Sequence, residues 1–205
     1  MSNTSDFAQR ARQSIEASIA AKQRLLGDAG LISTVAEVSQ ILVEAMGKGN
    51  KLILFGNGGS AADAQHIAAE FVGRFAFNRP PLPAMALSVN TSCLTAIGND
   101  YGYELTFSRQ VEALGKSGDV AIGISTSGNS PNVLHGLATA KKMGMPTVAF
   151  AGGTGGKMKD AADYLLCAPS NDTPRIQECH ILIGHIISEL VEATIFHEQS
   201  RVSRS

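Results

Sequence analysis

The chain has 205 residues and a formal net charge of −1, with 44% apolar and 17% charged side chains. This composition excludes an intrinsically disordered chain, and the length is ample for one domain with a buried core. Basic and acidic side chains also balance within residues 1–50, which leaves no electrostatic footprint for nucleic acid.

The chain carries three widely spaced cysteines, an odd number that indicates neither a disulfide framework nor a zinc knuckle. Its first residues lack the apolar core of a signal peptide. The most apolar C-terminal stretch, residues 179–196, is interrupted by two histidines and two glutamates, which a bilayer-spanning helix would not tolerate. We therefore expect a cytoplasmic protein that binds neither a membrane nor nucleic acid.

The N-terminal part predicts two helices, residues 6–26 and 31–47, the second because apolar side chains recur at helical spacing and glycines follow it. After residue 50 the pattern changes to short apolar runs, most of them separated by helical stretches. These runs predict five strands and then a last long helix: 51–55, 84–88, 119–124, 147–151 and 164–168 for the strands, and 174–198 for the helix.

Strands that alternate with helices indicate a parallel sheet covered on both faces, and therefore an α/β fold. The chain divides into N-terminal helices at 1–50, an α/β domain at 51–198 and a tail at 199–205, effectively one domain. Because the terminal helices exceed what one small sheet can cover, we expect an oligomer, with residues 1–50 taking part in its interfaces.

The loop STSGNS at 125–130 directly follows a predicted strand and precedes Pro131, a residue favoured at the first position of a helix. Ligands of parallel sheets bind at the carboxyl ends of the strands. A helix N-terminus also holds phosphate through its free backbone N–H groups. Helix capping accounts in part for the last serine, but not for four hydroxyls in six positions. We therefore predict a phosphate site formed by Ser125, Thr126, Ser127 and Ser130.

A second glycine-rich loop, GNGGS at 56–60, also follows a strand. It is not a Walker loop, and the dinucleotide fingerprint fits poorly because the next strand does not end in an acidic residue. Ser60 and Asp63 match a capping box, which would explain both residues structurally. Gly58 and Gly59 would let a ligand approach the backbone, and Asn57 supplies a polar side chain.

His66 and Glu70 lie four residues apart on the helix after this loop and therefore share one face. Such a pair suits a divalent metal such as zinc. The last helix adds Gln177 and His185, whose spacing corresponds to about 12 Å of rise and about 80° of rotation. Either these two side chains lean towards each other, or different subunits contribute them. The neighbouring Glu178 and His180 receive no functional role.

Four segments, in this order, resemble sugar isomerase (SIS) domains, and within these the phosphoheptose isomerase family: GNGGSAADAQHIAAEF at 56–71, AIGND at 96–100, STSGNS at 125–130 and RIQECH at 175–180. The resemblance covers nearly the whole chain. It implies a three-layer α-β-α SIS fold with a five-stranded parallel sheet, an N-terminal helical extension and a long C-terminal helix. It also implies a cytoplasmic homotetramer with active sites between subunits and one zinc ion per subunit.

The reaction that the resemblance implies is the isomerisation of D-sedoheptulose 7-phosphate to D-glycero-D-manno-heptose 7-phosphate, the first step towards the ADP-heptose of lipopolysaccharide. It implies Glu70 as general base and His185 as general acid. Some relatives carry an acidic residue where this chain has Pro174. The implied zinc ligands are His66, Glu70, Gln177 and His185. The implied substrate contacts are Asn57, Gly58, Gly59, Glu70, Asn99, Asp100, Ser125, Thr126, Ser127, Ser130 and Gln177.

These residue types fit the chemistry, because a carbonyl moves between adjacent carbons when a base removes a carbon-bound proton and an acid serves the oxygens. A metal would stabilise the enediolate that forms. Two alternatives stay open. One is a non-catalytic SIS protein that binds the replication initiator, although such proteins lack the carboxylate and the histidine. The other is an isomerase for a different sugar phosphate.

Overall fold

The computed structural model describes residues 3–196. The predicted tail at 199–205, and the last two residues of the predicted final helix and of the α/β domain, lie outside the described residues. Within the described part, five parallel strands form one sheet in the order β2-β1-β3-β4-β5, which confirms the predicted fold class. The strands are β1 (Leu52–Gly56), β2 (Ala84–Ala86), β3 (Val120–Ser125), β4 (Thr147–Gly152) and β5 (Tyr164–Ala168).

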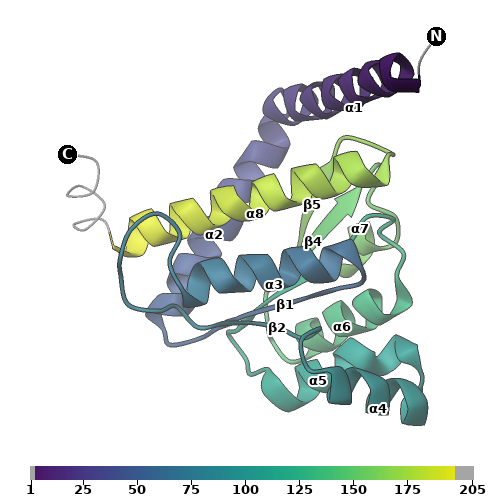
Figure 1. Ribbon diagram of the computed structural model, residues 1–205. Helices are drawn as coiled ribbons and strands as arrows, with labels where there is room; N and C mark the ends of the chain where they lie inside the picture. The colour runs from purple at the N-terminus through teal and green to yellow at the C-terminus, as the bar shows by residue number, and fades with distance from the viewer. Residues whose placement is uncertain (1–2, 197–205) are drawn as a thin grey trace.

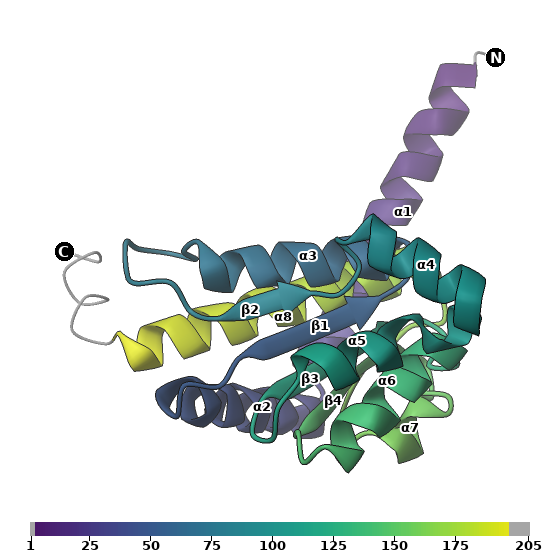
Figure 2. The same ribbon diagram turned by 90° about the horizontal axis from the view of Figure 1, so that it is seen from below.

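Helices cover both faces of this sheet, giving three layers (Figures 1 and 2). Side chains alternate along β1, so that Leu52 and Leu54 join the core under one helical layer while Ile53 and Phe55 join the other. The first layer contains α2 (Ala29–Gly47), α3 (Gly59–Val72) and α8 (Thr173–Ile195). The second contains α4 (Thr91–Tyr101), the 3-10 helix η1 (Tyr103–Leu105), α5 (Thr106–Leu114), α6 (Pro131–Lys142) and α7 (Met158–Ala161).

Helix α1 (Asn3–Leu26) extends away from this body (Figures 1 and 2). Only its C-terminal part joins the core, through Ala21 and Leu25. Nearer the N-terminus of this helix, the apolar side chains of Phe7, Ile15 and Ile19 are exposed. A helix with an uncovered apolar face is unfavourable in water, so this helix is built to contact something beyond the described chain.

Helix α2 is long and apolar enough to cross a membrane by length and composition alone, but its apolar side chains have a nearer explanation. Val38 and Leu42 are fully buried and belong to the same core as Leu52 of β1. The helix therefore covers the sheet as part of the α/β body, although the sequence grouped it with an N-terminal extension.

Helices α3 and α8 run side by side in the same direction, because the start of each lies against the start of the other and their middles also meet. Gln177 lies against Gly59, and Ile67 lies against Gly184. A Cβ atom on Gly184 would lie 2.5 Å from Ile67 Cδ1, so only glycine permits this close approach. This pairing positions the site described next.

Candidate active site

The closely paired helices bring three ligand-type side chains together on one side of the molecule. His66 Nε2 lies 3.0 Å from Glu70 Oε1, and it lies 2.9 Å from His185 Nε2 on the neighbouring helix. One nitrogen or oxygen from each residue lies within 4.8 Å of the others, an arrangement that could hold a metal ion. The His66 side chain is 51% exposed and that of Glu70 is 20% exposed, so the group opens onto the surface.

Gln177 makes its described contact at the start of α3. Its amide lies directly against Gly59, at the start of α3, whereas His66 follows two turns later along that helix. Seven residues of α-helix correspond to about 10 Å of rise, of which the His66 side chain covers a part because it leans towards the start of the helix. Of the four predicted zinc ligands, a single chain therefore places three together and holds the fourth near the glycine-rich loop.

The predicted phosphate loop lies at the carboxyl end of β3 and leads into α6, as expected. Ser130 occupies the N-cap position but makes no side-chain cap, which corrects the capping prediction. Its hydroxyl instead lies 2.9 Å from Ser125 Oγ, and Ser125 Oγ lies 3.4 Å from Ser127 Oγ. The three hydroxyls converge at the helix N-terminus, where backbone N–H groups favour an anion.

A polar cavity of about 260 Å³ adjoins this loop. Thr126 and Ser127 form one side, and the segments that follow β4 and β5 and the first turn of α8 form the rest. Hydroxyl and amide side chains together with exposed backbone dominate its lining, which is the chemistry that binds a polyol or a phosphate. The lining consists of Thr126, Ser127, Gly152, Gly153, Thr154, Ser170, Asn171, Thr173 and Ile176.

The glycine-rich loop at 56–60 leads into α3, which begins at Gly59, one residue before the N-cap position that a capping box would give to Ser60. Gly58 sits at the N-cap position with φ +56°, a conformation that favours glycine, so Ser60 already lies inside α3. The predicted capping box is therefore wrong. Asp63 Oδ2 is buried without a hydrogen-bond partner among the described residues, and burial raises the pKa of Asp63 to about 6, against a smaller opposing effect of His66.

Asn57 is held in place from two sides. Its amide exchanges hydrogen bonds of 2.9 Å with the Asn132 amide, and its Oδ1 accepts from the Tyr103 hydroxyl at 3.1 Å. These contacts link the residue after β1 to the first turn of α6 and to η1. The structure thus fixes this side chain between the two glycine-rich loops, where a ligand of both loops would meet it.

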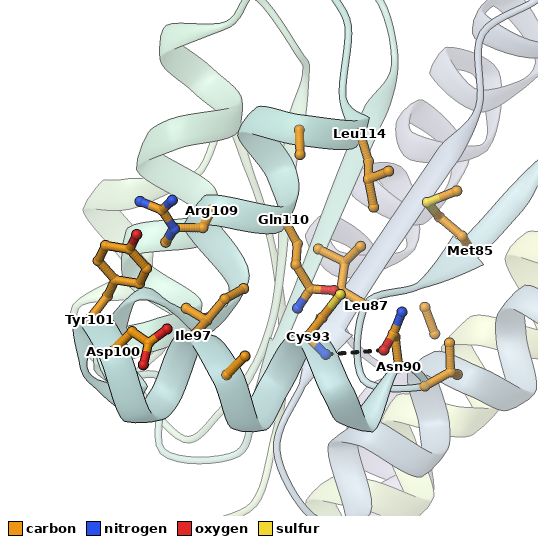
Figure 3. Close-up of a pocket in the computed structure, with 14 residues that line it drawn as sticks. Met85, Leu87, Asn90, Cys93, Ile97, Asp100, Tyr101, Arg109, Gln110 and Leu114 are labelled. Carbon is orange, nitrogen blue, oxygen red and sulfur yellow. Dashed lines mark hydrogen bonds between the residues drawn. The ribbon is translucent and has the colours of Figure 1, made fainter.

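Asn99 and Asp100 lie at the end of α4, a helix that buries none of its side chains. Asn99 donates a hydrogen bond of 2.8 Å to the Asp100 carboxylate. Asp100 also lines a mostly apolar cavity of about 500 Å³ between β2, α4 and α5, near the stacked pair Tyr101 and Arg109 (Figure 3). This larger cavity is separate from the histidine group and contains none of its three members.

Glu178 and His180 have structural surroundings. Glu178 pairs with Arg175, whose guanidinium also donates to the Ser14 carbonyl oxygen of α1 at 3.0 Å. His180 is fully buried, and its Nε2 lies 2.9 Å from the Ala151 carbonyl oxygen. Burial lowers the pKa of His180 to about 4, against a smaller opposing effect of that hydrogen bond.

The sequence interpretation missed a buried ion pair beside the site, between Arg79 and Glu192. Both side chains are 1% exposed. The available signal was Glu192 itself, which lies two helical turns after His185 in a strongly apolar helix. A carboxylate at such a position needs a buried partner.

Comparisons with known proteins agree with this fold. A family model for the SIS domain matches residues 15–152, more than half of the chain, so the chain belongs to the SIS domain family. A phosphoheptose isomerase from Sulfurimonas denitrificans is 55% identical over 185 residues, which is 90% of this chain and 95% of that protein. One from Roseiflexus sp. is 53% identical over 200 residues, covering 97% of this chain and 100% of that protein.

Among solved structures, phosphoheptose isomerase from Neisseria gonorrhoeae matches with a TM-score of 0.86 and 41% identity, covering 91% of this chain and 99% of that one. The one from Francisella tularensis gives the same TM-score at 34% identity, with coverage of 90% and 97%. Within the SIS family the chain is a member of the phosphoheptose isomerases, and it is an isomerase with the SIS fold. This finding excludes the non-catalytic alternative.

Proposed function

We propose that the protein interconverts D-sedoheptulose 7-phosphate and D-glycero-D-manno-heptose 7-phosphate through an enediol. The names of its relatives support this reaction. The observation that carries the proposal is the group of Glu70, His66 and His185, because it places a carboxylate and two imidazoles within 4.8 Å of one another at an open surface. A carboxylate and an imidazole are the base and acid that such a reaction needs.

In this mechanism, Glu70 removes the proton from the carbon beside the carbonyl and returns it to the neighbouring carbon. His185 serves the oxygen atoms, taking a proton from the hydroxyl that becomes the carbonyl and giving one to the carbonyl that becomes a hydroxyl. Because a single carboxylate carries the carbon-bound proton, the substrate must be able to reach it, and the partial exposure of Glu70 allows this. Ser125, Ser127 and Ser130 hold the phosphate that anchors the sugar.

The donor set also fits zinc. Two imidazole nitrogens and one carboxylate are ligands that zinc takes in proteins. Nitrogens bound to one tetrahedral zinc lie roughly 3.3 Å apart, close to the 2.9 Å between His66 Nε2 and His185 Nε2. When bound, zinc would supply a Lewis acid for the substrate oxygens. We propose one zinc ion per subunit, held by His66, Glu70, His185 and Gln177.

We further propose that two subunits complete each site. From Gly59 to Glu70 the helix rises about 16 Å away from the strand ends where the phosphate loop lies. Eight bonds of about 1.5 Å separate the phosphorus atom from the far end of a heptose, at most about 12 Å. The exposure of His66 and the position of Gln177 likewise favour a second subunit that brings a phosphate loop and Gln177 to this surface.

The uncovered apolar face of α1 supports assembly as well, and we propose the homotetramer that the family resemblance implies, with residues 1–50 in its interfaces. We also propose a cytoplasmic location and a place at the start of ADP-heptose synthesis for lipopolysaccharide. Both follow from the same resemblance and from the substrate.

The test is turnover of sedoheptulose 7-phosphate by the purified protein, before and after chelation and after return of zinc. We expect chelation to abolish turnover and zinc to restore it. His66→Gln should lower the zinc content measured by atomic emission, whereas His135→Gln, an exposed histidine on α6, should not. Turnover indifferent to chelation would remove the metal from the proposal. Turnover of another sugar phosphate alone would replace the substrate.

A further inference from the structure

The pair of Arg79 and Glu192 lies between the two helices that carry the proton-transfer groups. Arg79 belongs to the segment between α3 and β2, and Glu192 lies on α8. Arg79 Nε donates to Glu192 Oε1 at 2.8 Å, and both side chains are almost completely buried. A buried ion pair is not favourable by itself, because desolvation offsets much of its attraction. The backbone groups that each partner also binds show what such a pair can hold in place.

Arg79 secures the end of the helix that carries Glu70. Its Nη2 donates to the backbone oxygen of Glu70 at 2.7 Å, and its Nη1 donates to that of Phe71 at 2.6 Å and of Gly73 at 3.2 Å. The last carbonyls of a helix have no partners within the helix. Five fixed donors make arginine suited to several of them at once, in a way that lysine is not.

Glu192 secures the segment that contacts His185. Its two oxygens accept from the backbone N–H groups of Phe75 at 2.8 Å and Ala76 at 2.7 Å. The Phe75 ring then lies 5.8 Å, centroid to centroid, from the His185 ring. Burial alone would raise the pKa of Glu192, but the Ala76 and Phe75 amides and the Arg79 guanidinium outweigh it, so its pKa lies below the usual range. The carboxylate therefore remains charged and accepts all three bonds.

We propose that Arg79 and Glu192 are positioning residues that set the placement of Glu70 relative to His185. Arg79 binds the carbonyl oxygens of the last turn of α3, and Glu192 holds Phe75 against the His185 ring. The ion pair between Arg79 and Glu192 connects these two contacts. The proposal deepens the proposed function, since it rests on Glu70 and His185 as the proton-transfer groups. Neither Arg79 nor Glu192 contacts the substrate in this scheme.

The test compares Glu192→Gln and Arg79→Lys with a matched control, Asp119→Asn. Asp119 is also fully buried, and its carboxylate accepts from the backbone N–H groups of Lys51 and Lys116 and from Lys51 Nζ. Those bonds join β1 to β3 rather than α3 to α8. All three substitutions keep the side-chain shape or charge approximately and weaken a buried ion pair.

We expect kcat to fall by about 10-fold to 100-fold in both site variants, because small misplacements of reacting groups have effects of this size. KM should stay within about twofold, since the phosphate loop is untouched, and the Asp119→Asn enzyme should keep its kcat. Unchanged kcat in a folded Glu192→Gln enzyme would overturn the proposal. A general loss of stability would instead lower kcat in the control as well, and that result would also overturn it.

A second readout is independent of turnover. The ring signal of His185 in NMR spectra, identified by its loss in His185→Gln, senses the Phe75 ring. It should move in Glu192→Gln and in Phe75→Leu, and stay in place in Asp119→Asn. If Glu70→Gln kept full turnover, the proposed function would fail, yet this signal would still decide the positioning role. If Glu192→Gln does not fold, a double variant with methionine at both Arg79 and Glu192 replaces it in this experiment, because it leaves no unpaired buried charge. An unmoved His185 signal in that double variant would overturn the proposal.

Discussion

His66 and His185 face each other across the contact between α3 and α8, with their Nε2 atoms 2.9 Å apart and their ring planes at 61°. Glu70 Oε1 also lies 3.0 Å from His66 Nε2, so a carboxylate oxygen and a second imidazole nitrogen converge on one ring nitrogen. A carboxylate and two imidazoles at this spacing share protons easily or share a cation. Either property follows from the parallel packing of two helices that are more than one hundred residues apart in the chain.

The first prediction concerns the base. Glu70→Gln keeps the side-chain size but removes the group that accepts the carbon-bound proton, so kcat for sedoheptulose 7-phosphate should fall by about 100-fold to 10,000-fold. Substrate binding, measured by calorimetry, should persist because the phosphate loop is intact. Glu178→Gln is the control, since Glu178 pairs with Arg175 rather than with the histidines, and its kcat should stay within about twofold. Full turnover by Glu70→Gln would refute the assignment.

The second prediction concerns the shared site. If Glu70 of one subunit works with Gln177 of another, Glu70→Gln and Gln177→Ala proteins should each be inactive but should complement each other when co-expressed. Random mixing leaves about a quarter of the sites with both native residues, so about a quarter of the wild-type turnover should return. Separately purified proteins that are mixed without subunit exchange provide the baseline. Absence of recovery in verified mixed tetramers would place both residues in one subunit.

The third prediction concerns the phosphate loop. Ser130→Ala removes one of three converging hydroxyls, so KM should rise by about 10-fold, as expected for loss of a hydrogen bond to a charged group, while kcat changes little. Inorganic phosphate should raise the Tm of the native protein, as any ligand of the folded state does, and should raise that of Ser130→Ala less. Ser117→Ala, in an exposed turn before β3, is the control. An unchanged KM would argue against this loop as the phosphate site.

Local features of the molecule could be read from the sequence because they depend on neighbouring residues. The five apolar runs became the five strands, and the spacing of His66 and Glu70 placed both on one face of α3. The capping box failed because Gly58 adopts φ +56° and begins the helix before Ser60. The preference of Ser60 and Asp63 for helix starts does not reveal that conformation of Gly58.

Features that depend on tertiary packing could not be read in the same way. His185 joins His66 only because Gly184 lets α8 approach Ile67 of α3 closely. Helical spacing within the last helix related His185 to Gln177 instead, although the structure places Gln177 against Gly59 and His185 against His66. Arg79 and Glu192 pair across 113 positions, so no local pattern connects them.

The fourth prediction concerns pH and stability. His180 is fully buried, and its pKa is about 4 instead of the ordinary 6.5, so between these values the unfolded chain binds a proton that the folded protein does not. Stability from this residue is therefore fully present above pH 6.5 and is lost as the pH falls towards 4, by roughly 3 kcal/mol at most.

His180→Gln can still donate to the Ala151 carbonyl oxygen but does not titrate. Denaturant unfolding from pH 7 to pH 4 should therefore show a smaller loss of unfolding free energy in this variant than in the native protein, even if the variant is less stable at pH 7. The exposed His135→Gln is the control and should keep the native pH dependence. Parallel curves for native protein and His180→Gln would mean that burial of this imidazole is not what weakens the fold in acid.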